Sequence, residues 1–530
     1  MRSKLIVLTA VLASLLEIID TSIVNVAIPS MMGNLGATLD EISWVVTGYI
    51  IANAIVLPIS SWLSAQFGRK LYYTSCIILF TAASVACGLS TSLGMLVFFR
   101  ILQGLAGGAL LPTSQALIFE SFPKEKAGIA SAIYGMSVMV GPTVGPVLGG
   151  YLTDHFGWRM IFNINLPIGI VVAILSFLLV EDVGFDPAAN QTKEELKAKR
   201  KTQKTPIDVW GLVFLISGIG CLQFVLERGQ ADDWFDSKLI LITAIIAVTS
   251  IVGLIWWELK KAPHPILELR HFKNKSFTGG VLLMSGVGVV LYGLIFIIPV
   301  FVSTIQGLTA TQTGALFIPG ALLAAMIMPI IGASLRKIDA RFLIATGVIT
   351  LSIAVFKISY FDSFTSVDGM FVPLLFRGAA LAFLFVPINT VVLSQFSGNE
   401  IGQAAGLLNL CRQLGGSVGI ALISTFFQRY QVLSYSVLTT HITSLDHEAW
   451  RVAHQIQMSM QGKMADVVGM GTSAMDSVKI LTGMAHKQAF VIGYQKIVRI
   501  IAFGYLLSLL PLILLKKKEG TASGPAMDAH

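Results

Sequence analysis

The sequence predicts an all-α polytopic membrane protein with fourteen spans, arranged as two six-helix halves plus two inserted helices. Three observations support this fold class: the composition, the apolar segments of spanning length and an internal repeat. Of the 530 residues, 55% are hydrophobic and 12% are charged, whereas soluble domains carry about 25% charged residues. The composition therefore excludes a soluble globular protein.

Apolar segments long enough to cross a bilayer recur along the whole chain. A span needs about 20 predominantly apolar residues. Windows of this length place spans near residues 5–28, 43–64, 72–91, 93–119, 127–152, 160–180, 208–227, 238–258, 277–301, 311–334, 342–361, 370–395, 401–427 and 489–515. The segments between them are short, except at 183–206 and 429–488.

An internal repeat relates the first spans to the last ones. Five residues recur 274 positions later, with Thr143 matched by Ser417: Gly128, Ala130, Gly141, Val144 and Gly145 correspond to Gly402, Ala404, Gly415, Val418 and Gly419. Neighbouring pairs have almost the same offset: Arg100 with Arg377 (277), Pro112 with Pro387 (275) and Pro29 with Pro299 (270). Near-constant offsets over four helices indicate duplication of a six-helix unit.

This repeat divides the chain into three parts. We expect an N-terminal six-helix half at 1–182, a cytoplasmic linker with two inserted helices at 183–275, and a C-terminal six-helix half at 276–530. A long external loop is expected at 429–488 within the last part. Two halves related by an axis along the membrane normal place a substrate site near the midplane between them.

Basic residues predict the orientation of the chain. They occupy connections on one side only, which by the positive-inside rule is the cytoplasmic side; examples are Arg2, Lys4, Arg69, Lys70, Lys124, Lys126, Lys193, Arg200, Lys260, Lys275, Arg336, Arg341 and Lys516. Both termini are then cytoplasmic. This bias, together with attraction to anionic lipids, accounts for the net charge of +8 without a nucleic-acid partner.

Two carboxylates lie within the first span. Glu17 and Asp20 are three residues apart, so they share one helix face, which must look into a protein interior or a cavity. Counting about 1.5 Å per residue from the outer ends of the two spans, Asp20 lies about 15 Å deep and Arg100 of the fourth span about 10 Å deep, so pairing between them is geometrically possible. Asp20 is therefore either a proton carrier, a structural partner of Arg100, or both. Glu17 is either a second proton site, a counter-charge for a cationic substrate, or a hydrated residue.

Arg412 lies close to the middle of its span. An isolated charge there costs at least about 2.5 kcal/mol, so Arg412 needs a partner, either within the bundle or on an anionic substrate. Four polar residues within spans are expected to line the substrate cavity: Asn25, Gln103, Asn409 and Arg412.

The fifth span carries a doubled Gly-Pro pattern. Gly141, Gly145 and Gly149 are four residues apart on one face, which permits close approach of another helix. Pro142 and Pro146 remove backbone donors and bend the helix. Tight packing would explain the glycines in any membrane bundle, but the doubled spacing favours a hinge or seal between the two halves, with Gly150 at its end.

Three motifs resemble those of fourteen-span drug:proton antiporters of the EmrB/QacA type, within the major facilitator superfamily. Residues 19–29 (IDTSIVNVAIP) resemble the first-helix motif, residues 141–150 (GPTVGPVLGG) resemble the fifth-helix antiporter motif, and Arg100 with Gln103, Gly104 and Gly108 resembles the fourth-helix motif. The likeness covers essentially the whole chain, and the long segment before the last span resembles the EmrB branch.

One family-wide loop departs from the pattern. Gly68, Arg69 and Lys70 are kept between the second and third spans, but Ser61 and Ala65 stand where the family has a glycine and an aspartate. The carboxylate of a cytoplasmic ion-pair latch is therefore missing at its usual place. Arg69 and Lys70 also fit simple positive-inside residues.

The resemblance implies the major facilitator fold and proton-driven export of amphipathic drugs or toxic small molecules across the inner membrane by alternating access. The segment 429–488 is either a solvated loop or, as its resemblance to the EmrB branch implies, a docking site for a periplasmic membrane-fusion adaptor with its outer-membrane channel. No ATP-binding loop, metal-ligand spacing or nucleophile motif is present, so no cofactor and no enzyme activity are expected. The alternatives are a transporter of one specific metabolite and a membrane receptor or assembly subunit that transports nothing.

Overall fold

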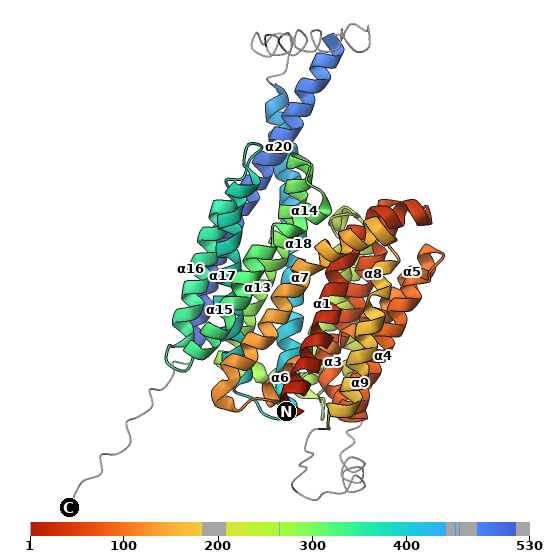
Figure 1. Cartoon of the computed structure of the whole chain (residues 1–530), viewed down its shortest axis with the longest axis vertical. Coiled ribbons are helices and arrows are strands. Elements are labelled where there is room, and N and C mark those ends of the chain that lie inside the picture. Colours follow the sequence, from red (N-terminus) through yellow and green to blue (C-terminus); the bar gives the residue numbers. More distant parts are fainter. Residues whose placement is uncertain are drawn as a thin grey trace, which may run out of the picture.

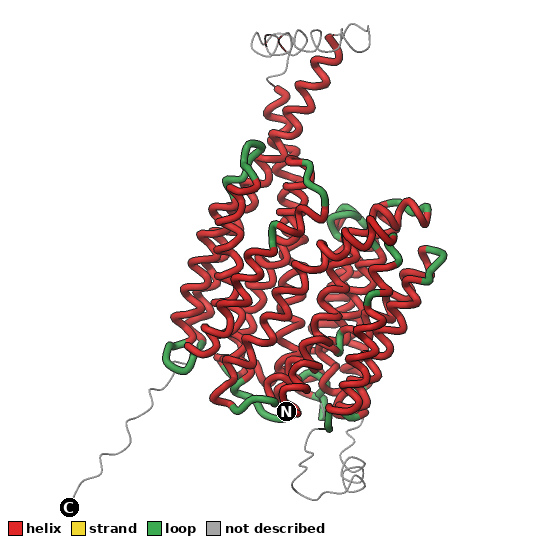
Figure 2. Tube along the Cα trace, viewed as in Figure 1, coloured by secondary structure: helices red, strands yellow, loops and turns green. Residues whose placement is uncertain are grey.

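The computed structural model describes residues 2–182, 208–440 except 264, residues 451 and 455, and 474–515. These residues form helices joined by short turns, and the described part contains no strand (Figure 2). The predicted cytoplasmic linker, most of the expected external loop and the C-terminal end lie outside the described residues.

Fourteen helical segments are long and apolar enough to cross a membrane, as the sequence predicts. Some spans consist of two consecutive helices. The helices are α1 (Arg2–Leu35), α2 and α3 (Leu39–Ile42, Trp44–Phe67), α4 (Arg69–Gly88), α5 and α6 (Leu93–Gly107, Leu110–Glu120), α7 (Ala127–Phe156), α8 and α9 (Met160–Asn163, Asn165–Leu179), α11 (Val209–Arg228), α12 (Lys238–Lys260), α13 (Lys275–Phe301), α14 and α15 (Ala310–Ala315, Ile318–Ser334), α16 (Ala340–Ile358), α17 (Val367–Leu393), α18 (Asn399–Thr440) and α20 (Ala474–Tyr505).

The helices gather into two groups of the same internal design. In the first half, α1 to α9, helix α1 packs along α7; in the second half, α13 to α20, helix α13 packs along α18 (Figure 1). The two halves meet along two seams. One seam is formed by α3 and α6 against α18, and the other by α7 against α14, α15 and α17.

The glycines of α7 are packed against α1. A side chain at Gly141, Gly145 or Gly149 would collide with Ile18, Ser22 or Ile23 of α1, so small residues are needed for this close approach. The three glycines therefore pack within their own half, and their expected role as a hinge or seal between the halves stays a prediction. Neighbouring residues of α7 contact the second half: Pro146 packs on Gly314 and Gly150 packs on Thr311, both in α14.

The inserted pair lies against the seam between α3 and α18. Helix α12 packs on α11, and α11 contacts both α3 and α18. The inserted helices therefore touch both halves.

Helices α18 and α20 project together beyond the bundle as a two-helix stalk, made of residues 429–440 and 474–488 (Figure 1). The side chains of Gln431 and His486 lie 3.3 Å apart, and the Tyr435 and His486 rings pack edge to face. The expectation of a loop throughout 429–488 is therefore wrong at both ends of this segment. We call this end of the bundle the stalk side and the opposite end, where the N-terminus lies, the terminal side.

Candidate functional site

The carboxylate of Asp20 lies in the core of the first half. Its side chain is fully buried, and Arg100 Nη1 lies 2.6 Å from its Oδ2. Two amides donate hydrogen bonds to the other oxygen, Gln103 Nε2 at 2.8 Å and Asn165 Nδ2 at 2.9 Å. The Asp20 carboxylate of α1 is thus held by side chains of α5 and α9. Helix α4 contributes indirectly, because its Ser84 accepts a hydrogen bond from Asn165.

Hydrogen bonds and a ring contact hold the Arg100 guanidinium in place. Its Nε donates to the Val45 carbonyl at 3.1 Å and its Nη1 also donates to Gln103 Oε1 at 2.8 Å. The guanidinium lies 4.1 Å from the centre of the Tyr49 ring, a cation–π contact. A buried ion pair is tolerated only when its remaining donors and acceptors are satisfied in this way. The pairing of Asp20 with Arg100 expected from their depths is present.

Gln103, which was expected to line the substrate cavity, is buried in this carboxylate network. Asn165 was not singled out by sequence reasoning, nor was Ser84, whose hydroxyl accepts from Asn165 at 2.9 Å. An amide in the sixth span is a polar group within an apolar window, and that signal could have identified Asn165. Its partner, however, lies 145 residues away.

Glu17 occupies a different position, at the centre of the molecule between the halves. Its side chain is buried, and its Oε1 accepts from Asn53 Nδ2 at 3.0 Å and from the Tyr49 hydroxyl at 3.5 Å. Its Oε2 has no hydrogen-bond partner in the part of the chain that the structure describes. The nearest charge from the other half is Arg412, which interacts with Glu17 electrostatically without forming an ion pair among the described residues.

Arg412 faces Glu17 across the interface. The Arg412 side chain is 3% exposed, its guanidinium lies 5.6 Å from the Phe385 ring, and its Nε and Nη1 have no hydrogen-bond partner. Tyr134 and Tyr292 lie within its electrostatic range. A cation with free donors and an acid with a free acceptor, set among aromatic rings, can hold an amphipathic molecule that carries a charged or polar group.

A chain of polar side chains crosses the interface next to this pair. Tyr134 donates to Asn409 Oδ1 at 3.0 Å, Asn409 donates to Gln115 Oε1 at 2.6 Å, and Gln115 donates to Asn389 Oδ1 at 2.6 Å. We call these side chains, together with Glu17 and Arg412, the central cluster. Asn409 was expected in the substrate cavity, and it lies in this cluster. Gln115 and Asn389 follow Pro112 and Pro387, the repeat pair of the fourth helices, by three and two residues, so nearly equivalent positions of the two halves meet here.

Asn25 lies apart from the central cluster. It is exposed, two helical turns beyond Glu17 in α1 and towards the stalk side, and none of its hydrogen bonds within the described residues reaches the central groups. We expected Asn25 to line the same cavity as Asn409 and Arg412. The structure does not place Asn25 beside them.

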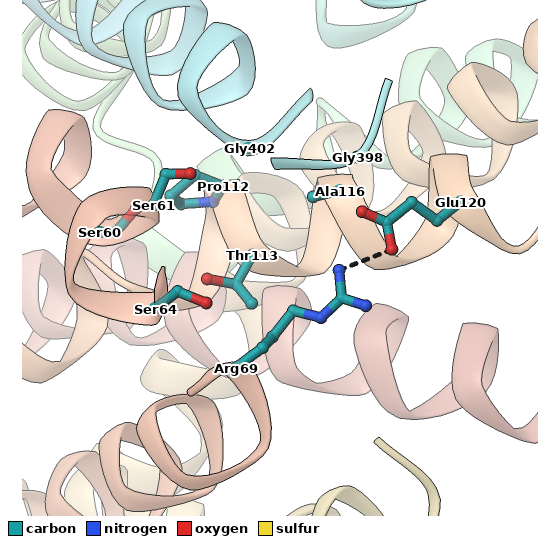
Figure 3. A pocket seen from close by; sticks show the side chains of 10 residues that line it. All are labelled: Ser60, Ser61, Ser64, Arg69, Pro112, Thr113, Ala116, Glu120, Gly398 and Gly402. Carbon is teal, nitrogen blue, oxygen red and sulfur yellow. Dashed lines mark hydrogen bonds and ion pairs between the residues drawn. The ribbon is translucent and has the colours of Figure 1, made fainter. Parts of the chain in front are cut away.

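The loop between α3 and α4 forms a second polar site on the terminal side (Figure 3). Gly68 has a φ of +90°, which favours glycine, and Arg69 Nη1 lies 2.6 Å from Glu120 Oε2. Helix α18 begins directly above them: Gly402 packs closely on Ser61, which stands at the family's glycine position. Lys70 stacks its ammonium over the Phe177 ring at 4.6 Å.

Arg69 thus has a carboxylate partner although the usual aspartate is replaced by Ala65. Sequence reasoning missed Glu120, because its closeness to Arg69 depends on the packing of α6 beside α3. The Arg69–Glu120 pair lies within the first half, and it borders the start of α18 in the second half.

Comparisons with known proteins agree with this architecture. The model of the Major Facilitator Superfamily matches residues 10–420. The chain is 32% identical to the multidrug export protein EmrB of Escherichia coli (strain K12), with 100% of this chain and 98% of that protein covered. It is also 32% identical to the fatty acid resistance protein FarB of Neisseria gonorrhoeae, over 92% of this chain and 90% of that protein.

Solved structures show the same fold. The crystal structure of the human organic anion transporter MFSD10 (TETRAN) superimposes with a TM-score of 0.61 at 14% identity, covering 97% of this chain and 99% of that one. The full-length identity to EmrB proteins and the family match lead to one conclusion. The chain is a multi-pass membrane protein of the major facilitator superfamily and belongs to its EmrB-type family of multidrug exporters.

Proposed function

We propose that this protein is a proton-coupled antiporter that exports amphipathic drugs or toxic small molecules by alternating access. The observation that carries the proposal is the fully buried Asp20 carboxylate, held by Arg100 and two amides. Carboxylates within membrane spans mark proton pathways. Asp20 lies one helical turn from Glu17, so a proton on Asp20 acts close to the substrate region.

The central cluster supports an amphipathic substrate. Glu17 and Arg412 each retain an unpaired polar atom, and Tyr49, Tyr134 and Phe385 supply aromatic surface. Arg412 then takes an anionic group of the substrate, and Glu17 takes a cationic group or a second proton. The names of two relatives, a multidrug export protein and a fatty acid resistance protein, agree with such a range.

The proposed cycle moves the half at 1–182 against the half at 276–530. With both termini in the cytoplasm, as the basic residues predict, the stalk side faces outwards and the terminal side inwards. Within the central cluster, the hydrogen bonds between Asn409, Gln115 and Tyr134 hold the two halves together. Gly68, Arg69 and Lys70 act at the cytoplasmic end of the seam between α3 and α18.

The test is proton movement in proteoliposomes. Substrates are first identified by a resistance screen of an efflux-deficient strain that expresses the chain. Addition of such a compound to proteoliposomes with a pH-sensitive dye inside should move protons with the wild type and not with Asp20→Asn. Asp154→Asn, an exposed acid in α7, is the matched control. Drug movement without proton movement would contradict the coupling, and no compound recovered in the screen would favour a receptor.

The proposed roles of Arg412 and Glu17 in substrate binding are tested with compounds of opposite charge. Arg412→Gln should weaken export of anionic compounds and leave cationic ones less affected, while Glu17→Gln should do the reverse. We expect about a tenfold change for the affected class, as for loss of one charge-assisted contact. The same change for both classes in both variants would contradict charge recognition.

We further propose that the stalk is a docking surface for a periplasmic adaptor protein. Its helices expose apolar side chains outside the bundle: Val432, Leu433, Val437 and Met484. Replacement of Val432 and Val437 by Ser should abolish co-purification of an adaptor and leave transport in proteoliposomes intact. Unchanged co-purification would contradict this surface.

A further inference from the structure

The inserted helix α11 contacts both halves at the same end of the molecule. Its C-terminal turns lie on the stalk side, between α2–α3 of the first half and α18 of the second half. No part of the proposed transport chemistry uses these turns. The side chains on them nevertheless form two polar contacts, one with each half.

The contact with the first half combines apolar packing with an ion pair. Phe224 packs on Trp44, with ring centres 5.8 Å apart, and Gly220 packs on Ile55. Arg228, which is 6% exposed, lies 2.8 Å from Asp40 Oδ1 and also donates to Ser43 Oγ at 3.0 Å.

The contact with the second half consists of hydrogen bonds. Gln223 Nε2 lies 2.6 Å from Ser417 Oγ and 3.0 Å from Glu227 Oε1, and Ser417 Oγ donates to Glu227 Oε1 at 3.0 Å. Gln223 is fully buried and Ser417 is 6% exposed. Six residues past the end of α11, Trp234 Nε1 donates to Thr425 Oγ1 at 3.0 Å.

These two contacts differ in how they can open. Separating Phe224 and Gly220 from Trp44 and Ile55 would expose apolar surface, which costs free energy in proportion to the area. Separating Glu227 and Gln223 from Ser417 costs less when water enters, because water replaces the lost hydrogen bonds. The partners on α18 also form a row along one face, since Ser417 and Thr425 are eight residues apart.

We propose that α11 is a tether that moves with the first half, and that the contact of Gln223 and Glu227 with Ser417 is released whenever α3 and α18 separate on the stalk side. These three residues then gate the seam between the halves. This inference rests on the proposed alternating access. It assigns the inserted pair a place in the transport cycle and names the contact that must break.

The experiment compares two cysteine pairs in a functional background that lacks the four native cysteines. Glu227→Cys with Ser417→Cys spans the releasable contact, and Gly220→Cys with Ile55→Cys spans the permanent one. Each pair is bridged with a short bis-methanethiosulfonate reagent, and transport is measured before bridging, after bridging and after reduction.

Bridging Glu227→Cys to Ser417→Cys should lower transport about tenfold or more, and reduction should restore it, because a locked conformational step limits turnover. Bridging Gly220→Cys to Ile55→Cys should leave transport within about twofold. Transport that survives the first bridge would show that the contact never opens. A block by the second bridge would show that α11 does not move with the first half.

Unbridged variants separate this inference from the proposed function. If the reduced proteins and the background protein move no drug, the proposed function fails and the bridges are not the cause. A second measurement needs no bridge: spin labels at Gln230 and Gln428, on the two sides of the releasable contact, should show a longer distance when substrate and a proton gradient are applied. An unchanged distance in a protein that transports would overturn the proposal.

Discussion

The two halves of this protein share one packing design. Helix α7 approaches α1 through Gly141, Gly145 and Gly149, and α18 approaches α13 in the same way, because Gly415 and Gly419 lie against the backbone of Ser285 and Val289. The repeat that predicted the duplication thus records the contacts between the first and fifth helices of each half. Packing of this kind tolerates no side chain at the contact.

The same two halves differ in their buried acids, although both bury arginines. At the offset of 270 residues that relates Pro29 to Pro299, Asp20 corresponds to Val290, which is buried and apolar. Among the described residues, Arg377, the repeat partner of Arg100, therefore has no acid beside it, and its Nε has no hydrogen-bond partner. Arg377 is 7% exposed, and its guanidinium lies 5.2 Å from the Phe317 ring. Duplication preserved the scaffold, while the titratable pair is confined to the first half.

The largest expected effect concerns the acid that only the first half carries. Asp20→Asn should reduce drug resistance to the level of cells without the protein, because the amide has nearly the same shape but carries no titratable proton. The variant should still insert and fold, which size-exclusion profiles in detergent will check. Wild-type resistance in a correctly inserted Asn variant would remove the distinction between the halves.

The second prediction contrasts the equivalent arginines. Arg100→Ala should destabilise the protein by about 3–5 kcal/mol, because it leaves a buried acid without its cation. Arg100→Lys should lose less, since the charge is kept without the planar fork. Arg377→Met should cost less than about 1 kcal/mol, because no partner is left unpaired. Thermal unfolding midpoints in detergent measure all three, and equal losses for Arg100→Ala and Arg377→Met would contradict the asymmetry.

The third prediction tests the shared packing. Gly145→Leu and Gly419→Leu should each destabilise the protein by about 1–3 kcal/mol, because each forces a side chain into a close helix contact. Gly94→Leu is the control, since no atom lies within 4 Å of a Cβ at that position. Thermal unfolding in detergent is again the measurement. A loss at only one of the two glycines would show that the halves do not share this design.

The smallest effect is expected at the loop of the first half. The Arg69 and Glu120 side chains are 12% and 24% exposed, and partly exposed ion pairs contribute about 0–1 kcal/mol. A double-mutant cycle of Arg69→Ala and Glu120→Ala should give a coupling energy in this range. The equivalent loop of the second half uses Arg336, which donates to the Glu125 carbonyl at 3.2 Å. A coupling energy above about 2 kcal/mol would show that the Arg69 pair is a stronger latch than this comparison indicates.

Sequence alone determined the number of spans and the duplication, and it offered the pairing of Asp20 with Arg100 as one alternative. Each of these depends on local properties. An apolar window marks a span because unsatisfied polar groups are costly in lipid, a constant offset marks a repeat, and depth along a helix follows from 1.5 Å per residue. Depths of about 15 Å and about 10 Å permitted Asp20 and Arg100 to pair, and the structure decided that they do.

Only the tertiary structure decided which helix meets which face. Gln103 binds the Asp20 carboxylate, Asn165 joins it from 145 residues away, and Glu120 takes the place of the missing aspartate beside Arg69. The glycine face of α7 meets α1 within its own half, and α11 contacts both halves. A helix has the same apolar pattern whichever neighbour it packs against. Its partner is chosen by the joint packing of all fourteen spans, which no local pattern records.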